Sequence, residues 1–271
     1  MKENGNRLLD KLENKIAVVT GGAMGNGLGI VETFCKYKAK VAILDYSDEL
    51  KATVNKLASL GYEVSGYKVD IRDKEKVDIC IKKIYDKYGR IDILVNNAGI
   101  CCLELFTKMS DEMRDDHFDI NIKGTWNVTK SVLPHMINNN KGSIINLSSV
   151  TGPMVADSGE VAYATTKSAL IGFTKSLAIE YADHNIRVNA ILPGYILTPM
   201  VQKMATSTNP LNPSLVISSI EKNIPMKRMG TIKEIGELSA FLASDESSYI
   251  TGSEFVIDGG STLPETNSMG V

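Results

Sequence analysis

Short apolar runs alternate with longer stretches of helical periodicity from residue 16 to residue 257. This alternation is typical of parallel sheets whose strands are joined by right-handed helical crossovers. Each run is apolar enough to be buried on both faces of a sheet. The sequence predicts strands at 16–20, 40–45, 63–69, 91–96, 142–148, 187–192 and 254–257, and helices near 27–38, 47–60, 73–88, 110–138, 161–183 and 231–243.

The length of the chain favours a single domain over residues 1–271. It has 271 residues, and single hydrophobic cores stop growing at roughly 250 to 300 residues. No internal repeat or low-complexity linker interrupts the alternation. We therefore expect a Rossmann-type α/β fold, in which one doubly wound sheet of seven parallel strands is flanked by helices.

The segment 198–223 differs from the rest of the chain. It contains Asn-Pro twice, several Ser and Thr residues, and scattered apolar side chains. Its position directly after a predicted strand favours a helical flap that covers a substrate. A surface insertion without ligand contact is the alternative.

Composition and charge favour a cytoplasmic protein with a small-molecule substrate. The net charge of -2 creates no long-range field that would gather nucleic acid or anionic lipid. The four cysteines form no C-x-x-C pair, so we expect neither a disulfide framework nor a metal site. Residues 1–15 lack the apolar core of a signal peptide, and no apolar run approaches the ~18 residues that span a bilayer.

A glycine-rich turn directly follows the first predicted strand and precedes a helix. Residues 20–27 have the sequence Thr-Gly-Gly-Ala-Met-Gly-Asn-Gly. Glycines let the backbone turn tightly and let a pyrophosphate approach the N–H groups of a helix N-terminus. A turn needed only for packing is the alternative, but the flanking strand and helix favour a dinucleotide site.

Asp45 closes the second predicted strand, about 20 residues beyond the glycine turn. A carboxylate there can accept hydrogen bonds from both adenosine ribose hydroxyls and would repel a 2′-phosphate. Neither the next two residues nor the glycine turn supplies a cation, so NAD(H) is favoured over NADP(H). A helix N-cap, the alternative role, would suit Ser47 or Asp48 better.

Polar and small residues end two further predicted strands. Asp70 and Ile71 follow one strand, and Asn-Asn-Ala-Gly at 96–99 follows another. Open α/β sheets bind ligands at this carboxyl edge. Asn and Asp are also common turn formers, so each position is ambiguous by itself.

Tyr163 and Lys167 are four residues apart on a predicted helix, which places the phenol and the ammonium on one face. A nearby lysine cation lowers the pKa of a phenol from about 10 toward working pH, as a general acid-base requires. The same spacing also occurs by chance in many helices.

Two polar residues upstream are further candidates. Ser149 follows a predicted strand and offers a hydroxyl to a substrate oxygen. Asn121 lies within a long amphipathic helix, where its side chain either kinks the helix through a hydrogen bond or takes part in a proton relay.

Together these motifs resemble the classical branch of the short-chain dehydrogenase/reductase family. The matching set, in order, is Thr-Gly-x-x-x-Gly-x-Gly at 20–27, Asn-Asn-Ala-Gly at 96–99, Asn121, Ser149, Tyr-x-x-x-Lys at 163–167 and Pro-Gly at 193–194. The resemblance extends over residues 12–261. Two features differ: Asn26 replaces a bulky aliphatic residue that is frequent there, and the loop 150–162 is one residue longer than in many members.

The resemblance implies a role for each matched residue. Tyr163 would exchange a proton with the substrate oxygen, and Lys167 would bind the nicotinamide ribose and depress the tyrosine pKa. Ser149 would hold the oxygen, and Asn121 would support a water relay. The residues implied to contact NAD(H) are Gly21, Gly25, Asn26, Gly27, Asp45, Asp70, Ile71, Asn97, Ala98, Gly99, Tyr163, Lys167, Pro193, Gly194, Ile196 and Thr198.

The implied reaction is hydride transfer between nicotinamide and an alcohol or ketone carbon. The segment 258–266 is similar to the tail of a bacterial branch of oxidoreductases that has hydroxysteroid dehydrogenases among its relatives. Adaptable apolar side chains also favour a hydrophobic ketone such as a hydroxysteroid. The residues expected around the carbonyl are Cys101, Cys102, Met154, Tyr195, Met200 and Met204.

The resemblance also implies a homotetramer, in which helices 110–138 and 161–183 pair across subunits and the C-terminal tail 261–271 reaches toward a neighbouring site. A sugar, polyol or small secondary alcohol is the alternative substrate. Reduction of an acyl-carrier-protein substrate ranks lower, because Asp45 disfavours NADPH. A dinucleotide sensor or scaffold is the non-enzyme alternative, although all four residues of the catalytic set are present.

Overall fold

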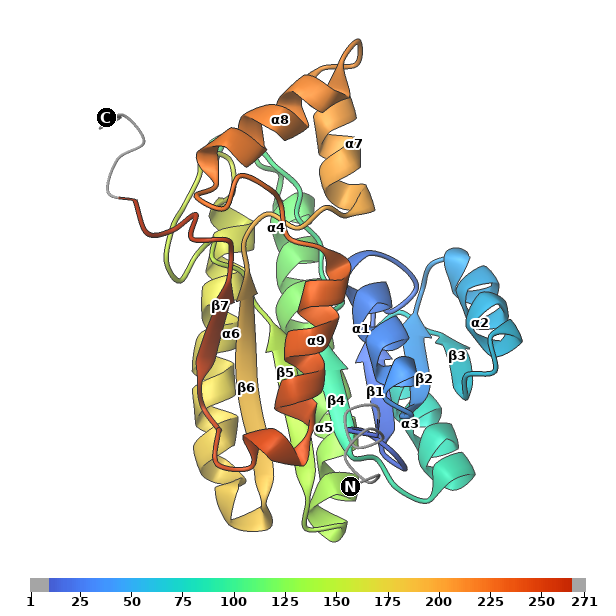
Figure 1. The fold of residues 1–271 in the computed structure, drawn as a ribbon. Coiled ribbons are helices and arrows are strands. Elements are labelled where there is room, and N and C mark those ends of the chain that lie inside the picture. The colour runs from blue at the N-terminus through green and yellow to red at the C-terminus, as the bar shows by residue number, and fades with distance from the viewer. Residues whose placement is uncertain (1–9, 265–271) are drawn as a thin grey trace.

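A computed structural model describes residues 10–264 (Figure 1). Seven strands form one parallel sheet in the order β3-β2-β1-β4-β5-β6-β7. The strand order reverses between β1 and β4, which places the ligand crevice of a doubly wound sheet at their carboxyl ends. The predicted fold is therefore confirmed. The strands are β1 (Ile16–Thr20), β2 (Lys40–Asp45), β3 (Val64–Lys68), β4 (Ile93–Asn96), β5 (Gly142–Leu147), β6 (Ile186–Pro193) and β7 (Glu254–Ile257).

Helices cover both faces of the sheet. Residues of α1, α2 and α9 share one buried cluster with the strands, and residues of α3, α5 and α6 share the other. No helix among residues 10–264 is both long and apolar enough to cross a membrane. The helices are α1 (Gly25–Lys36), α2 (Glu49–Ser59), α3 (Lys74–Tyr88), α4 (Asp111–Phe118), α5 (Thr125–Asn138), α6 (Val161–Glu180), α7 (Pro199–Thr208), α8 (Pro213–Asn223) and α9 (Ile232–Ala243).

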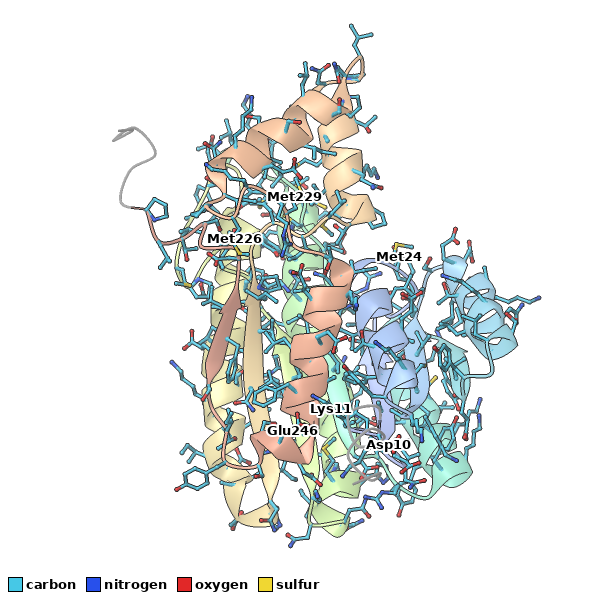
Figure 2. The ribbon with its side chains drawn as sticks, viewed as in Figure 1. Asp10, Lys11, Met24, Met226, Met229 and Glu246 are labelled. Carbon is cyan, nitrogen blue, oxygen red and sulfur yellow. The ribbon has the colours of Figure 1, made fainter. Side chains whose placement is uncertain are left out.

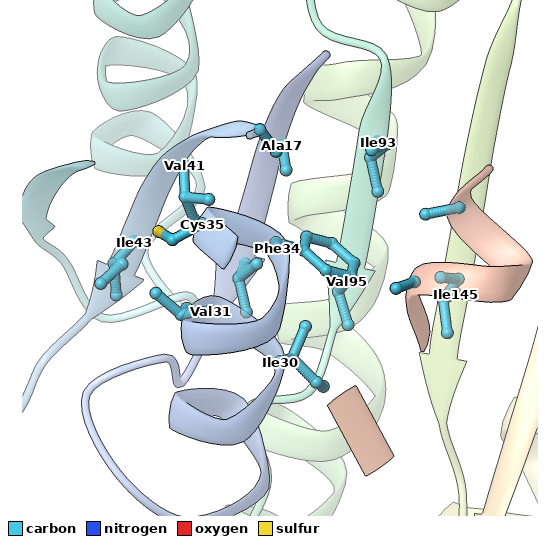
Figure 3. Close-up of a cluster of buried hydrophobic side chains, with 14 of the residues drawn as sticks. Ala17, Ile30, Val31, Phe34, Cys35, Val41, Ile43, Ile93, Val95 and Ile145 are labelled. Carbon is cyan, nitrogen blue, oxygen red and sulfur yellow. The ribbon is translucent and has the colours of Figure 1, made fainter. Parts of the chain in front are cut away.

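The core beneath α1 explains why this helix is fixed on the sheet. Ile30, Val31 and Phe34 are fully buried and recur at helical spacing, so they line one face of α1. Burying each such side chain stabilises the fold by about 1.5–3 kcal/mol. Figure 3 shows this face against residues of four strands, namely Ala17, Val41, Ile43, Ile93, Val95 and Ile145.

A close helix contact holds α9 beside α1 (Figure 1). A Cβ atom on Gly29 would lie 2.1 Å from the carbonyl oxygen of Ile232, so only glycine permits this approach. At the other end of α9, Lys11 forms an ion pair with Glu246 at 3.0 Å (Figure 2). These contacts position α1, and hence the glycine turn that precedes it.

The predicted helix over 110–138 is confirmed as one helical segment over 111–138, but it is not an α-helix throughout. A π-helix covers Asp119–Gly124, between the end of α4 and the start of α5. Periodicity alone did not reveal it, because a single widened turn leaves the apolar pattern nearly unchanged. The widened turn contains Asn121, whose side chain is bonded to a neighbouring loop.

The predicted flap at 198–223 consists of two helices, α7 and α8, each of which begins at a proline. Proline is favoured at the first helical position because its missing N–H would have no partner there. Figure 1 shows both helices beyond the carboxyl edge of the sheet. Most of the predicted tail 261–271 lies outside the described residues, which end at 264.

Several predicted elements are one to three residues too long at their ends. The clearest case is β4, which begins at Ile93 rather than at 91. Directly before it, the Asp92 carboxylate accepts a hydrogen bond from the N–H of Ile16 at 2.9 Å, beside the backbone bond from the Asp92 N–H to the Ile16 carbonyl. Such side-chain contacts are invisible to apolar patterning.

Candidate active site

Thr20 and Asn97 join the glycine turn to the end of β4. The Thr20 hydroxyl accepts hydrogen bonds from the N–H groups of Asn97 and Ala98, both at 3.0 Å. In return, the Asn97 side-chain Nδ2 donates to the carbonyl oxygens of Thr20 and Gly21, at 3.0 and 2.9 Å. The Asn97 amide nitrogen, expected beside the cofactor ribose, thus holds the turn itself.

The glycine turn has the form that a dinucleotide needs. Gly21 has a φ of +62°, and a Cβ atom there would lie 2.9 Å from the Cα atom of Ala98. The next helix, α1, starts with neither a side-chain cap nor an acidic residue in its first turn, so its N–H groups suit an anion. In the same turn, the buried Oδ1 atom of Asn26 has no hydrogen-bond partner within residues 10–264. These features fit a bound dinucleotide.

Gly27 is required for packing within the turn. A Cβ atom at this position would lie 2.0 Å from the carbonyl oxygen of Gly21. Gly25, with a φ of +56°, lies opposite Thr198, whose Cβ atom would be 3.9 Å from an added Cβ. The closeness of Gly25 and Thr198 shows that the turn and the segment after β6 face each other. Met24 lies in the same turn (Figure 2).

Asp45 connects the end of β2 to the glycine turn. Its Oδ2 accepts a hydrogen bond from the N–H of Ala23 and its Oδ1 accepts one from the N–H of Ser47, both at 2.9 Å. The residue is buried. The N-cap alternative is wrong, because Asp48 is the residue at the N-cap of α2. Each carboxylate oxygen keeps a further lone pair that can accept from a ribose hydroxyl.

Asp70 and Ile71 lie beyond β3 as expected, but both side chains are engaged within the protein. Arg72 hydrogen-bonds the Asp70 carboxylate, with Nη2 2.7 Å from Oδ2, and this holds the pKa of Asp70 below its usual value. Ile71 is buried against the π-helix, since a Cβ atom on Gly124 would lie 2.6 Å from its Cδ1 atom.

The segment after β6 also lies at this edge. Gly194 passes close to Asp258, with 2.7 Å between the two Cβ positions if Gly194 carried one. Ile196 pairs with Gly230 in a β-bridge, and its side chain belongs to the core. The Thr198 hydroxyl caps α7 by accepting from the N–H of Val201 at 3.4 Å. Pro193 ends β6.

Tyr163 and Lys167 lie on one face of α6, as predicted. The Lys167 Nζ is 5.6 Å from the centroid of the Tyr163 ring and donates a hydrogen bond to the carbonyl oxygen of Leu147 at 2.7 Å. Leu147 is the last residue of β5. Ser149 lies two residues beyond the end of β5, and it is buried. The end of β5 and the start of α6 thus bring together three of the four catalytic candidates.

Asn121 is the fourth candidate, and its side chain is fully hydrogen-bonded. Oδ1 accepts from the N–H of Ile100 at 2.8 Å, and Nδ2 donates to the Ile100 carbonyl at 3.1 Å and to the Thr166 hydroxyl at 3.0 Å. A Cβ atom on Gly99 would lie 3.1 Å from this Oδ1 and 3.5 Å from the Lys167 Nζ. The side chain therefore fixes the loop after β4 beside the catalytic lysine.

Burial dominates the electrostatics of the tyrosine and the lysine. Burial raises the pKa of the Tyr163 phenol, while a hydrogen bond with Ser149 acts in the opposite direction. Burial also lowers the pKa of Lys167 to about 8. The expected lowering of the tyrosine pKa by the lysine is not found. The Lys167 ammonium donates its hydrogen bond to the Leu147 carbonyl instead. Desolvation of the phenol has the largest effect on the pKa of Tyr163.

The residues expected around the substrate carbonyl differ in exposure. Cys101 and Met204 are partly buried, and burial raises the pKa of the Cys101 thiol to about 12. The others are exposed: Cys102, Met154, Tyr195 and Met200.

Two residues near the site were missed from sequence. The ring of the buried His117 accepts a hydrogen bond at Nε2 from the N–H of Cys102, at 3.1 Å, and so holds the loop after β4. Its spacing of four from Asn121 was the available signal. Glu160, directly before α6, carries a buried carboxylate oxygen. No sequence pattern indicated this oxygen, because its burial depends on neighbouring loops.

Comparison with known proteins gives one consistent result. Residues 21–262 match the family described as enoyl-(acyl carrier protein) reductase, adh_short_C2. The oxidoreductase UcpA of Escherichia coli K12 is 54% identical, over 97% of this chain and 100% of that protein. The 3-oxoacyl-[acyl-carrier-protein] reductase FabG of Thermotoga maritima is 40% identical, over 92% of this chain and 98% of that protein.

A solved structure agrees with the sequence matches. The aldohexose dehydrogenase of Thermoplasma acidophilum superposes with a TM-score of 0.89 and 33% identity, over 97% of this chain and 100% of that one. The family match, the relatives and the shared seven-stranded fold therefore lead to one conclusion: this chain belongs to the classical short-chain dehydrogenase/reductase family of oxidoreductases, which typically use a nicotinamide dinucleotide.

Proposed function

We propose that the chain is an NAD(H)-dependent oxidoreductase that moves a hydride between nicotinamide and the carbon of a secondary alcohol or ketone. The observation that carries this proposal is the joint placement of Ser149, Tyr163 and Lys167 where β5 ends and α6 begins. Proton donor, hydroxyl and cation converge there, at the edge of the sheet where the glycine turn lies.

The residues divide the acid-base work between them. When bound, the nicotinamide supplies or accepts the hydride. Tyr163 remains protonated at neutral pH because burial raises its pKa, so it can donate its proton to a carbonyl oxygen during reduction. Ser149 can donate a hydrogen bond to the same oxygen, a contribution of about 3 kcal/mol in comparable sites. Lys167, whose pKa is lowered to about 8 by burial, is charged at neutral pH and would bind the nicotinamide ribose.

Asp45 supports NAD(H) rather than NADP(H) as the cofactor. Its buried carboxylate lies beside the glycine turn, and a 2′-phosphate would meet its negative charge at close range. The turn itself contains no lysine or arginine to offset this repulsion.

Two substrate classes follow from different observations. A hydrophobic ketone such as a hydroxysteroid is supported by the adaptable side chains of Met154, Met200 and Met204 near the site. A sugar, polyol or small secondary alcohol is supported by the partly buried Glu160 and by the structural likeness to an aldohexose dehydrogenase. Acyl-carrier-protein reduction, the activity in the name of one relative, is less favoured because of Asp45.

Two further properties belong to the same proposal: a homotetrameric assembly and a cytoplasmic location. The outer faces of α5 and α6 carry the exposed apolar side chains of Trp126, Val161 and Ile179, which suit subunit contacts. The Trp126 ring also packs on the half-buried Phe173, with 5.3 Å between the ring centroids. Light scattering of the purified protein at several concentrations tests the assembly.

The variant Tyr163→Phe tests the proposed function. It should bind NADH with nearly unchanged affinity and lose turnover by about 10²–10⁴-fold, because only the proton donor is removed. Tyr249→Phe, at a fully exposed tyrosine, is the matched control. Loss of NADH absorbance with ketosteroids, sugars and small ketones measures turnover. A fully active Tyr163→Phe protein would refute the assignment, and wild-type NADH binding without turnover on any substrate would favour the sensor alternative.

A further inference from the structure

Glu160 has an unsatisfied carboxylate oxygen at the candidate active site. The residue directly precedes α6 and lies three positions before Tyr163. The side chain is partly buried, and its Oε2 atom is buried without a hydrogen-bond partner in the described chain. Nearly all buried polar atoms in proteins are hydrogen-bonded, so an isolated one indicates a partner that is not among residues 10–264.

The neighbours of Glu160 belong to the substrate side of the site. Its negative charge contributes to raising the pKa of Cys101, of Tyr163 and of Tyr195, after the larger effect of burial on each. Cys101 follows β4, Tyr163 lies on α6 and Tyr195 follows β6. Residues after β4, on α6 and after β6 therefore lie within electrostatic range of this carboxylate.

Within residues 10–264, no lysine or arginine forms an ion pair with Glu160. Burial raises the pKa of Glu160, Asp157 raises it further, and only the Thr151 hydroxyl lowers it. The loop after β4 is joined to the segment before α6, since the N–H of Glu104 donates to the carbonyl oxygen of Gly159 at 3.0 Å. An anionic substrate would be repelled here, whereas a hydrogen-bond donor would be attracted.

We propose that Glu160 is a specificity-determining residue whose buried oxygen accepts a hydrogen bond from a second hydroxyl group, carried by the substrate next to its reacting carbon. The substrate is then a neutral polyol or hydroxyketone. This assignment rests on the proposed function and selects the hydroxylated class over the hydrophobic one. A substrate with an ammonium group in place of that hydroxyl is the competing possibility that the test must separate.

Matched alcohols that share one ring test the proposal by turnover with NAD⁺. The wild type should oxidise trans-1,2-cyclohexanediol with a kcat/KM about tenfold or more above that for cyclohexanol, as expected for a hydrogen bond to a charged group. Glu160→Met should reduce this ratio to near one by lowering the value for the diol alone. Glu180→Met, at the exposed far end of the same helix, should keep the wild-type ratio.

Glu160→Gln and a third alcohol separate the two kinds of donor. Glutamine keeps an acceptor oxygen but no charge, so this variant should retain part of the diol preference. A wild type that prefers 2-aminocyclohexanol to the diol, and loses that preference in Glu160→Gln, would overturn the hydroxyl assignment. Equal turnover of diol and cyclohexanol by the wild type would overturn the proposal altogether.

Binding to a non-reacting protein distinguishes failure of this inference from failure of the proposed function. Tyr163→Phe with NAD⁺ should hold the alcohols unreacted, and saturation-transfer NMR then compares their affinities. Tighter binding of the diol that disappears in the Tyr163→Phe, Glu160→Met double variant supports the role of Glu160, even if the wild type oxidises neither alcohol. Equal binding of both alcohols contradicts it, whatever the turnover.

Discussion

Asn121 and Ile100 exchange two hydrogen bonds, from the Ile100 N–H to the side-chain Oδ1 at 2.8 Å and from Nδ2 to the Ile100 carbonyl at 3.1 Å. The pair imitates the reciprocal bonding of two strand residues, but it joins a π-helix to the loop after β4. This loop also carries Cys101 and is held at Cys102 by His117. The asparagine therefore sets the distance between the cofactor edge of the sheet and the catalytic face of α6.

Asn121→Ala should destabilise the protein and reduce turnover. The substitution removes the partners of the Ile100 N–H and carbonyl groups, and leaving a buried polar group unpaired costs about 1–3 kcal/mol. Urea unfolding measures the change in the free energy of unfolding. The turnover number kcat is measured without denaturant, at a temperature at which the variant is folded. Asn138→Ala, on the exposed surface of α5, is the control. Equal unfolding midpoints for the two variants would show that the hydrogen bonds between Asn121 and Ile100 do not stabilise the protein.

Asp45→Ser should weaken the preference for NADH over NADPH by about tenfold or more, because it removes the charge that opposes a 2′-phosphate. The ratio of kcat/KM for the two cofactors is the measurement. Asp48→Ser is the control, because it removes an exposed charge three residues away that does not bond to Ala23 or Ser47. It should leave the ratio unchanged. A similar change in both variants would mean that general charge, rather than position, sets the preference.

The two reaction directions should respond differently to pH. Burial raises the pKa of Tyr163, so the phenol keeps its proton at neutral pH. Reduction uses that proton and should hold its rate between about pH 6 and pH 8, whereas oxidation needs the phenolate and should rise as the pH increases. Initial rates in both directions with one alcohol–ketone pair provide the test. An oxidation rate that is highest below neutral pH would contradict this assignment.

Glu234→Gln should remove an acid-sensitive part of the stability. The Arg228 hydrogen bond, helped by the N–H of Thr231, lowers the pKa of Glu234 to about 2 at the N-terminus of α9. A carboxyl group with a depressed pKa stabilises the folded state above the unfolded pKa of about 4.5, and this contribution is lost as the pH falls toward 2.

The difference in unfolding free energy between the wild type and Glu234→Gln should therefore be about 1 kcal/mol near pH 7, as for a helix cap, and should vanish near pH 2. Unfolding curves at a series of pH values measure it. Glu112→Gln, at an exposed glutamate of α4 without a side-chain hydrogen bond in the described residues, is the control and should change the free energy of unfolding little at either pH. A difference for Glu234→Gln that does not depend on pH would rule out the proposed linkage.

The sequence by itself determined the strand order along the chain, the glycine turn at 20–27 and the shared face of Tyr163 and Lys167. These features depend on short-range periodicity and on the few residues that a tight turn allows, so they can be read within one or two turns of chain. The carboxyl edge where the candidates gather follows from the parallel sheet that this periodicity implies.

Only the tertiary structure decided how these residues are held and charged. Lys167 donates to the Leu147 carbonyl, 20 residues away, and Asn121 bonds across 21 residues to Ile100. The π-helix, the raised pKa of Tyr163 and the unpartnered oxygen of Glu160 depend in the same way on burial between distant loops. Desolvation and long-range hydrogen bonding are properties of the folded surroundings, and local sequence patterns do not contain them.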